Sequence, residues 1–136
     1  MKIKAHDIKS KSFFLFFVII CLLSCKKNEE TPTIAFIEPS KTTIEASSPS
    51  TVNLKLKLAA PVQIDSLKVA DKVADADWRL LKTITFSPPS DTATFTGNYF
   101  IPQGFEGTEI LLKFSLYDKS KPGVPYAESI LTINVK

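Results

Sequence analysis

Few side chains in this sequence could carry out covalent or acid–base chemistry. The single histidine, His6, and both cysteines, Cys21 and Cys25, fall within the first 25 residues. The rest of the chain offers no imidazole or thiol, which excludes histidine-based triads, Cys–His pairs and zinc sites with such ligands there. Asp75 and Asp77 could act as the paired carboxylates of a glycosidase, but a chain of this size leaves little room for a substrate cleft. The sequence therefore predicts no enzyme and no catalytic residue.

The residues before Cys25 have the composition of a secretory leader. Four lysines and one aspartate precede an apolar run of eleven residues, 13–23. A membrane-spanning helix needs about 20 apolar residues, whereas the apolar core of a signal peptide needs about 7–15 after a basic flank. The run ends in Leu22-Leu23-Ser24-Cys25, which resembles the bacterial lipobox. The resemblance implies a lipoprotein signal peptide at 1–24 and a diacylglycerol on the Cys25 thiol. A shortened membrane anchor and a plain signal peptide are the alternatives.

Cleavage before Cys25 would also change the charge of the chain. It would remove four of the 17 basic residues and one of the 14 acidic residues, which leaves a net charge of zero. Nothing in this balance indicates nucleic-acid binding. Two or more acyl chains, such as palmitate, hold a protein stably on a membrane. We therefore expect a lipid-anchored protein of the cell envelope.

The segment 25–32 has the short, polar composition of a tether. Its Lys26-Lys27-Asn28-Glu29-Glu30 resembles the surface-export tethers of Bacteroidota lipoproteins. The resemblance implies the outer membrane, at either its periplasmic or its surface-exposed face.

Residues 33–136 show the two-residue hydrophobic alternation of β-strands. In the segment 51–58 the apolar side chains fall on one face and Asn53, Lys55 and Lys57 on the other, so one face is predicted to be buried. Ile64 and Leu67 are out of phase, which indicates a bulge or a short helix. The expected strands are 33–37, 51–58, 63–69, 83–86, 92–101, 109–117 and 129–135.

Two stretches are less clear, because 42–45 could continue the first strand after a kink and 70–81 could contain a helical turn. Seven strands separated by turn residues predict an all-β fold of two packed antiparallel sheets, an immunoglobulin-like sandwich. Ile110, Leu112, Phe114 and Leu116 are expected to face its core.

Several short motifs together resemble the Calx-beta family, whose domains are seven-strand sandwiches of ion exchangers and bacterial surface proteins. The motifs are Glu45, Ala76-Asp77-Trp78, Thr83-Ile84-Thr85-Phe86, Ser87-Pro88-Pro89 and Phe105-Glu106-Gly107-Thr108-Glu109 leading into 110–116. The resemblance spans about 33–135 and implies that Glu45, Asp77 and Glu106 bind calcium. Calcium needs about 6–8 oxygen ligands, and Ile101-Pro102-Gln103-Gly104 provides no acid where the family has an acidic cluster. Alternatively, Asp77 caps a turn and Glu106 is solvated.

Aromatic side chains give a second indication of binding. Trp78, Tyr99, Tyr117 and Tyr126 could stack on sugars or contact a protein, although Trp78 is expected to pack in the core. The loop 118–125 is flanked by two of the tyrosines, and loops at the end of a sandwich commonly carry recognition. The predicted binding residues are Tyr117, Asp118, Lys119, Lys121 and Tyr126.

The sequence thus predicts a membrane-anchored, non-catalytic lipoprotein that acts as a binding or adhesion module for a protein or a glycan. The alternative is a structural or assembly lipoprotein with no small ligand. No cofactor is expected, although calcium could stabilise either kind of protein.

Overall fold

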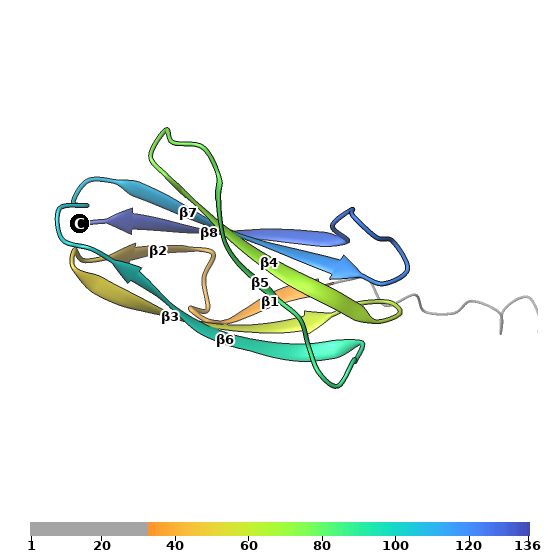
Figure 1. Ribbon diagram of the computed structural model, residues 1–136. Coiled ribbons are helices and arrows are strands. Elements are labelled where there is room, and N and C mark those ends of the chain that lie inside the picture. The colour runs from red at the N-terminus through yellow and green to blue at the C-terminus, as the bar shows by residue number, and fades with distance from the viewer. Residues whose placement is uncertain (1–32) are drawn as a thin grey trace, which may run out of the picture.

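The computed structural model describes residues 33–136, whose eight strands form two facing sheets (Figure 1). The strands are β1 (Thr33–Glu38), β2 (Thr43–Ala46), β3 (Ser50–Ala59), β4 (Ile64–Val73), β5 (Arg79–Ile84), β6 (Thr92–Ile101), β7 (Glu109–Asp118) and β8 (Ala127–Val135). One sheet has the order β1-β3-β6 and the other the order β2-β8-β7-β4-β5. The predicted signal peptide at 1–24, the lipidated Cys25 and the tether at 25–32 lie outside the described residues.

Residues 33–136 contain no helix, and therefore none long and apolar enough to span a membrane. The predicted all-β sandwich is confirmed, but its strand count is eight instead of seven. The additional strand is β2, which covers most of the stretch 42–45 that could have continued the first strand after a kink. The chain instead bends after Pro39 and crosses to the opposite sheet, so that Ile34 and Ile44 pack against the core from different sheets.

The expectation that both sheets are purely antiparallel is wrong at β2. This strand pairs in parallel with β8, from Thr43 opposite Thr132 to Ala46 opposite Val135. The ladder continues beyond the strand, because the Thr42 carbonyl accepts a hydrogen bond of 2.8 Å from the Thr132 amide. A short strand can therefore satisfy its backbone at this edge after crossing between the sheets.

The core lies where alternating side chains of the two sheets meet. Phe114 on β7 is completely buried, and its ring makes an edge-on contact with Phe36 (5.6 Å between ring centroids) and a tilted contact with Phe95 (6.3 Å). Strands β3, β7 and β8 contribute most of the other buried apolar side chains, as their two-residue alternation predicted. These are Val52, Leu54, Leu56, Leu58, Ile110, Leu112, Leu116, Leu131, Ile133 and Val135.

The region from Ile64 to Arg79 settles two questions that the sequence left open. One is the broken phase of Ile64 and Leu67, and the other is the helical turn that 70–81 could contain, which is not formed. A register shift between Ile64 and Ser66 accounts for the broken phase of Ile64 and Leu67, so the bulge is confirmed and the short helix is not formed. Strand β4 then continues to Val73. A turn, in which Ala74 has a positive φ of 50°, leads to β5 at Arg79.

The two sheets differ in width, since three strands face five. On one flank of the sandwich, β1 approaches β8, and the chain passes from β1 into β2. On the other flank, β6 is the edge of the smaller sheet and β5 the edge of the larger one. We call this second side the open flank, because no strand of the smaller sheet within residues 33–136 lies beyond β6.

Candidate binding groove on the open flank

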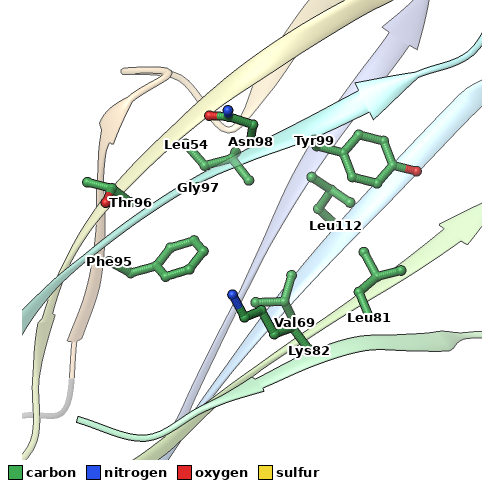
Figure 2. A pocket seen from close by; sticks show the side chains of 10 residues that line it. All are labelled: Leu54, Val69, Leu81, Lys82, Phe95, Thr96, Gly97, Asn98, Tyr99 and Leu112. Atoms are coloured by element: carbon green, nitrogen blue, oxygen red, sulfur yellow. The ribbon is translucent and has the colours of Figure 1, made fainter. Parts of the chain in front are cut away.

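A groove runs between β5 and β6 on the open flank, with a volume of about 240 Å³ (Figure 2). Apolar side chains from both sheets form most of its lining, and polar side chains complete it. The lining residues are Leu54, Val69, Leu81, Lys82, Phe95, Thr96, Gly97, Asn98, Tyr99 and Leu112. This groove combines an apolar surface with a few polar groups, which is the usual composition of a binding site.

A bulge in β5 directs two consecutive side chains into the groove. Val69 is opposite Lys82 and Ala70 is opposite Leu80, so Leu81 is the extra residue of the strand. Bulges re-aim side chains in this way, and both Leu81 and Lys82 line the groove. In Figure 2 the Lys82 amine extends from β5 toward the side of the groove that holds Phe95.

Gly97 shapes the surface on the β6 side. A Cβ atom at this position would lie 2.8 Å from Cζ of Phe95, closer than carbon atoms tolerate. The absence of a side chain therefore lets the Phe95 ring lie across the Gly97 backbone. This arrangement keeps Phe95 against Phe114 and leaves the groove beside it open.

A cluster of three polar side chains borders the groove and connects three strands. Asp71 on β4 is buried and accepts hydrogen bonds from Arg79 Nε (3.0 Å to Oδ1) and Arg79 Nη2 (2.7 Å to Oδ2) on β5. The hydroxyl of Tyr99 on β6 donates to Asp71 Oδ2 at 2.9 Å. A buried carboxylate is stable only when it is paired in this way. The Tyr99 contact thus joins the two sheets at their unequal edges.

The electrostatics of this cluster suit a structural role. Burial alone would raise the pKa of Asp71, but the hydrogen bonds from Arg79 and Tyr99 and the charge of Arg79 lower that pKa below its ordinary value. The pKa of Tyr99 is raised, mainly by burial and then by the hydrogen bond to Asp71 and the negative charge of Asp71. The carboxylate therefore stays ionised and the phenol stays protonated near neutral pH, so neither group is poised to exchange protons.

The sequence pattern indicates the inward positions of two members of this cluster, Asp71 and Tyr99. Leu67, Val69 and Asp71 follow one another at two-residue intervals, so the third of them falls on the inward face of β4. Tyr99 occupies the inward phase of β6 in the same way, two residues from Ile101. An acid on an inward face requires a partner. Arg79, whose guanidinium is largely exposed, could not be identified as that partner without the pairing of β4 and β5.

The predicted binding loop lies at one end of the sandwich, and its residues have different environments. Lys119, Lys121 and Tyr126 are exposed. Tyr117 is half-buried, with the Lys68 amine 4.8 Å from its ring centroid. The structure therefore places three of the five predicted residues where a partner could reach them.

Asp118 is fully buried and does not face solvent. Its Oδ2 accepts hydrogen bonds from the backbone amides of Val62 and Gln63, each at 3.0 Å, and its Oδ1 accepts from the amide (2.8 Å) and the hydroxyl of Ser120. Burial alone would raise the pKa of Asp118, but the hydrogen bonds from Ser120, Gln63 and Val62 lower it. This carboxylate fastens the loop after β7 to the loop after β3, and so has little capacity left for a ligand.

The three candidate calcium ligands are exposed and are not gathered into a site. Glu45 forms an ion pair with Lys136, while Asp77 lies in the turn before β5 and Glu106 in the loop before β7. Within residues 33–136, no group of three or more acidic, histidine or cysteine side chains is close enough to hold a metal ion. The donor set thus falls short of the oxygen shell of calcium, and the calcium site stays a prediction from the family resemblance.

Trp78 does not occupy the core position expected of it. It is 38% exposed in the turn directly before β5, and the Lys113 amine lies 4.4 Å from its ring centroid. The turn that carries Trp78 and the loop that carries Tyr126 lie at opposite ends of the sandwich (Figure 1). Trp78 and Tyr126 therefore do not form one stacking platform.

Comparison with known proteins bears on the fold alone. No protein-family model matches the sequence, and no curated protein is significantly similar to it. The solution structure of the CARDB domain of PF1109 from Pyrococcus furiosus superposes with a TM-score of 0.51 at 15% identity, over 77% of this chain and 94% of that domain. The Calx-beta resemblance stays a prediction.

Two further structures are more distant. The crystal structure of the same CARDB domain in complex with di-metal ions has a TM-score of 0.46 at 14% identity, over 80% of this chain and 97% of that one. A Niemann-Pick type C2 protein from the Japanese carpenter ant has a TM-score of 0.46 at 8% identity, over 77% of this chain and 89% of that one. The superposition on the solution structure, with its TM-score of 0.51, shows that residues 33–136 form an immunoglobulin-like β-sandwich similar in fold to the CARDB domain.

Proposed function

We propose that this protein is a lipid-anchored lipoprotein of the cell envelope whose sandwich is a non-catalytic binding module for a protein partner. The observation that carries the proposal is the groove on the open flank, where Leu81 and Phe95 provide apolar surface beside the Lys82 amine. Apolar surface with a small number of polar groups is what a binding site requires. Fold similarity alone would not support a function.

A protein partner is favoured over a glycan by the distribution of aromatic side chains. Sugar binding by stacking needs aromatic faces that lie together, whereas Trp78 and Tyr126 lie on separate parts of the sandwich. The groove instead presents aliphatic side chains and Phe95 beside two strand edges. Such a surface matches the side chains and backbone of another polypeptide.

In-cell photo-crosslinking of the full-length protein tests this proposal. A photoreactive amino acid is placed at Asn98 on the rim of the groove, at Val124 in the predicted binding loop, or at Asn134 on the outer face of β8. We expect a covalent adduct at position 98 and none at position 134. An adduct only at position 124 would move the site to the loop, and no adduct at either 98 or 124 would refute a binding module.

The membrane anchor has a separate test. Cells grown with an alkyne-labelled palmitate should label the wild-type protein, and the wild-type protein should fractionate with membranes. The Cys25→Ser variant should lose the label, whereas Cys21→Ser should keep it. Labelling that survives Cys25→Ser would contradict lipidation at that thiol.

A further inference from the structure

The four sheet edges within residues 33–136 differ in how well they are protected against pairing with another strand. Strand β2 has four residues, and β1 has six, with a bulge before Glu38 and a proline directly after it. Strand β5 carries Arg79 and Lys82. Short length, bulges, prolines and charges are the features that keep natural edge strands from recruiting partners.

Strand β6 has none of these protections. It runs for ten residues, Thr92–Ile101, without a charged side chain or a proline, and its register with β3 is continuous. Within the described chain it pairs only with β3, so the backbone groups along its other edge have no strand partner. Such an edge is a template for an additional strand.

The position beside β6 is also where the sandwich has room for a strand. Neighbouring strands lie about 4.8 Å apart, and facing sheets lie about 10 Å apart. A strand added to β6 would therefore lie opposite the overhanging β4 and β5. Its inward side chains would enter the groove, where Val69, Leu81 and Lys82 face them. The smaller sheet would then have four strands facing five.

We propose that the edge of β6 binds an extended segment of a partner protein as a fourth strand of the smaller sheet, with alternate apolar side chains in the groove and one carboxylate at Lys82. This inference rests on the binding function proposed above. The carboxylate follows from charge, because the groove lining contains one lysine and no acid. The nearby Asp71 is already neutralised by Arg79.

A second copy of this chain fits the edge less well. In a symmetric dimer, β6 would pair with β6 of the other copy. Strand β6 contains no acidic residue, so the second copy would bring no carboxylate to Lys82. A different protein with an apolar and acidic extended segment is therefore the better match.

Binding of synthetic peptides to the full-length lipoprotein in lipid nanodiscs tests this inference. The probe is a fluorescent peptide about eleven residues long that alternates threonine and valine and carries one glutamate among the inward positions. Two further versions are N-methylated at every second amide, in the two possible phases, so that each keeps the side chains but loses the hydrogen-bond donors of one strand edge. Fluorescence anisotropy measures the dissociation constants.

We expect the unmethylated peptide to bind, and one methylated version to bind at least about tenfold more weakly. Equal binding of all three versions would overturn strand addition while leaving a groove that recognises side chains. The crosslinking at Asn98 tests that broader function independently. Failure of every peptide to bind at about 1 mM, a Kd that corresponds to roughly −4 kcal/mol, would also overturn the inference.

A charge exchange tests the role of Lys82. Lys82→Glu should weaken binding of the glutamate peptide at least about tenfold and favour a peptide with lysine at that position. Lys57→Glu, on the exposed outer face of β3, is the matched control and should leave binding unchanged. Concentration-dependent dimers that compete with the peptide would show that a second copy occupies the edge, and would overturn the assignment to a different protein.

Discussion

The contacts of Asp118 predict that replacing this residue destabilises the fold. In Asp118→Ala the backbone amides of Val62, Gln63 and Ser120 lose their acceptor. The loop between β3 and β4 then loses its side-chain connection to the loop between β7 and β8. Since the carboxylate is fully buried, the substitution removes structural contacts and not a surface charge.

The size of the effect follows from the number of donors. A buried donor left without its partner costs about 1–3 kcal/mol. Val62 and Ser120 are exposed, so water can reach parts of this site, and the lower end of that range applies. Three amides at about 1 kcal/mol each give a loss of about 3 kcal/mol in the free energy of unfolding. For a domain with a total stability of about 5–15 kcal/mol this loss is large.

Chemical denaturation of wild type and variant measures the difference. Asp91→Ala, which removes an exposed aspartate of the connection between β5 and β6, is the matched control and should change stability by less than about 0.5 kcal/mol. If Asp118→Ala and Asp91→Ala unfold at the same denaturant concentration, then Asp118 does not fasten the two loops, and the reasoning is refuted.

The pH dependence gives a second measurement with a definite sign. Because the folded-state pKa of Asp118 is lowered, its stabilising contribution is complete above the unfolded-state pKa of about 3.9 and is lost as the pH falls through the folded-state pKa. The gap in stability between wild type and Asp118→Ala should therefore narrow below about pH 4. The Asp71 cluster is common to both proteins, so the difference isolates Asp118.

Three further predictions concern the core, the polar cluster and calcium. Phe114→Ala should lower the free energy of unfolding by about 3–5 kcal/mol because it removes a buried ring; a denaturation midpoint equal to that of Lys57→Ala would contradict the packing. Tyr99→Phe should lower the free energy of unfolding by about 1 kcal/mol, measured by chemical denaturation. It should also raise the pKa of Asp71, measured by carboxyl NMR titration, because a hydrogen bond that lowers that pKa is lost. An unchanged Asp71 pKa would show that the contact is absent. Calcium should leave the melting temperature unchanged because Glu45, Asp77 and Glu106 form no cluster; a rise that Glu45→Gln abolishes would instead support the site that the family resemblance implies.

Much of the fold could be predicted because the strands carry their burial pattern locally. Alternation from Val52 to Leu58 and from Ile110 to Leu116 places the apolar side chains of β3 and β7 correctly. The phase break after Ile64 correctly indicated an irregular strand. These features depend on neighbours two or three residues apart, which a sequence shows directly.

The remaining features depend on pairing between distant segments. The sheet to which Ile44 belongs is decided by β8, about ninety residues away, and no local pattern specifies that partner. Asp118 has the sequence context of a loop residue, but the amides of Val62 and Gln63 make it a buried acceptor. The groove arises from sheets of unequal width, which is a property of the whole topology and of no single motif.

The placement of the chain's entry into the fold has a mechanical consequence. The described chain begins at Thr33 in β1, and the free edge of β6 belongs to the same sheet. Tension between the residues before Thr33 and a molecule held on β6 would pass sideways through β1, β3 and β6 without crossing the core. Strands β1 and β3 share five register pairs, whereas β3 and β6 share ten. Under load, the ladder between β1 and β3 should rupture first. The released residues of β1 would then lengthen the connection to the residues before Thr33, while β6 stays paired with β3.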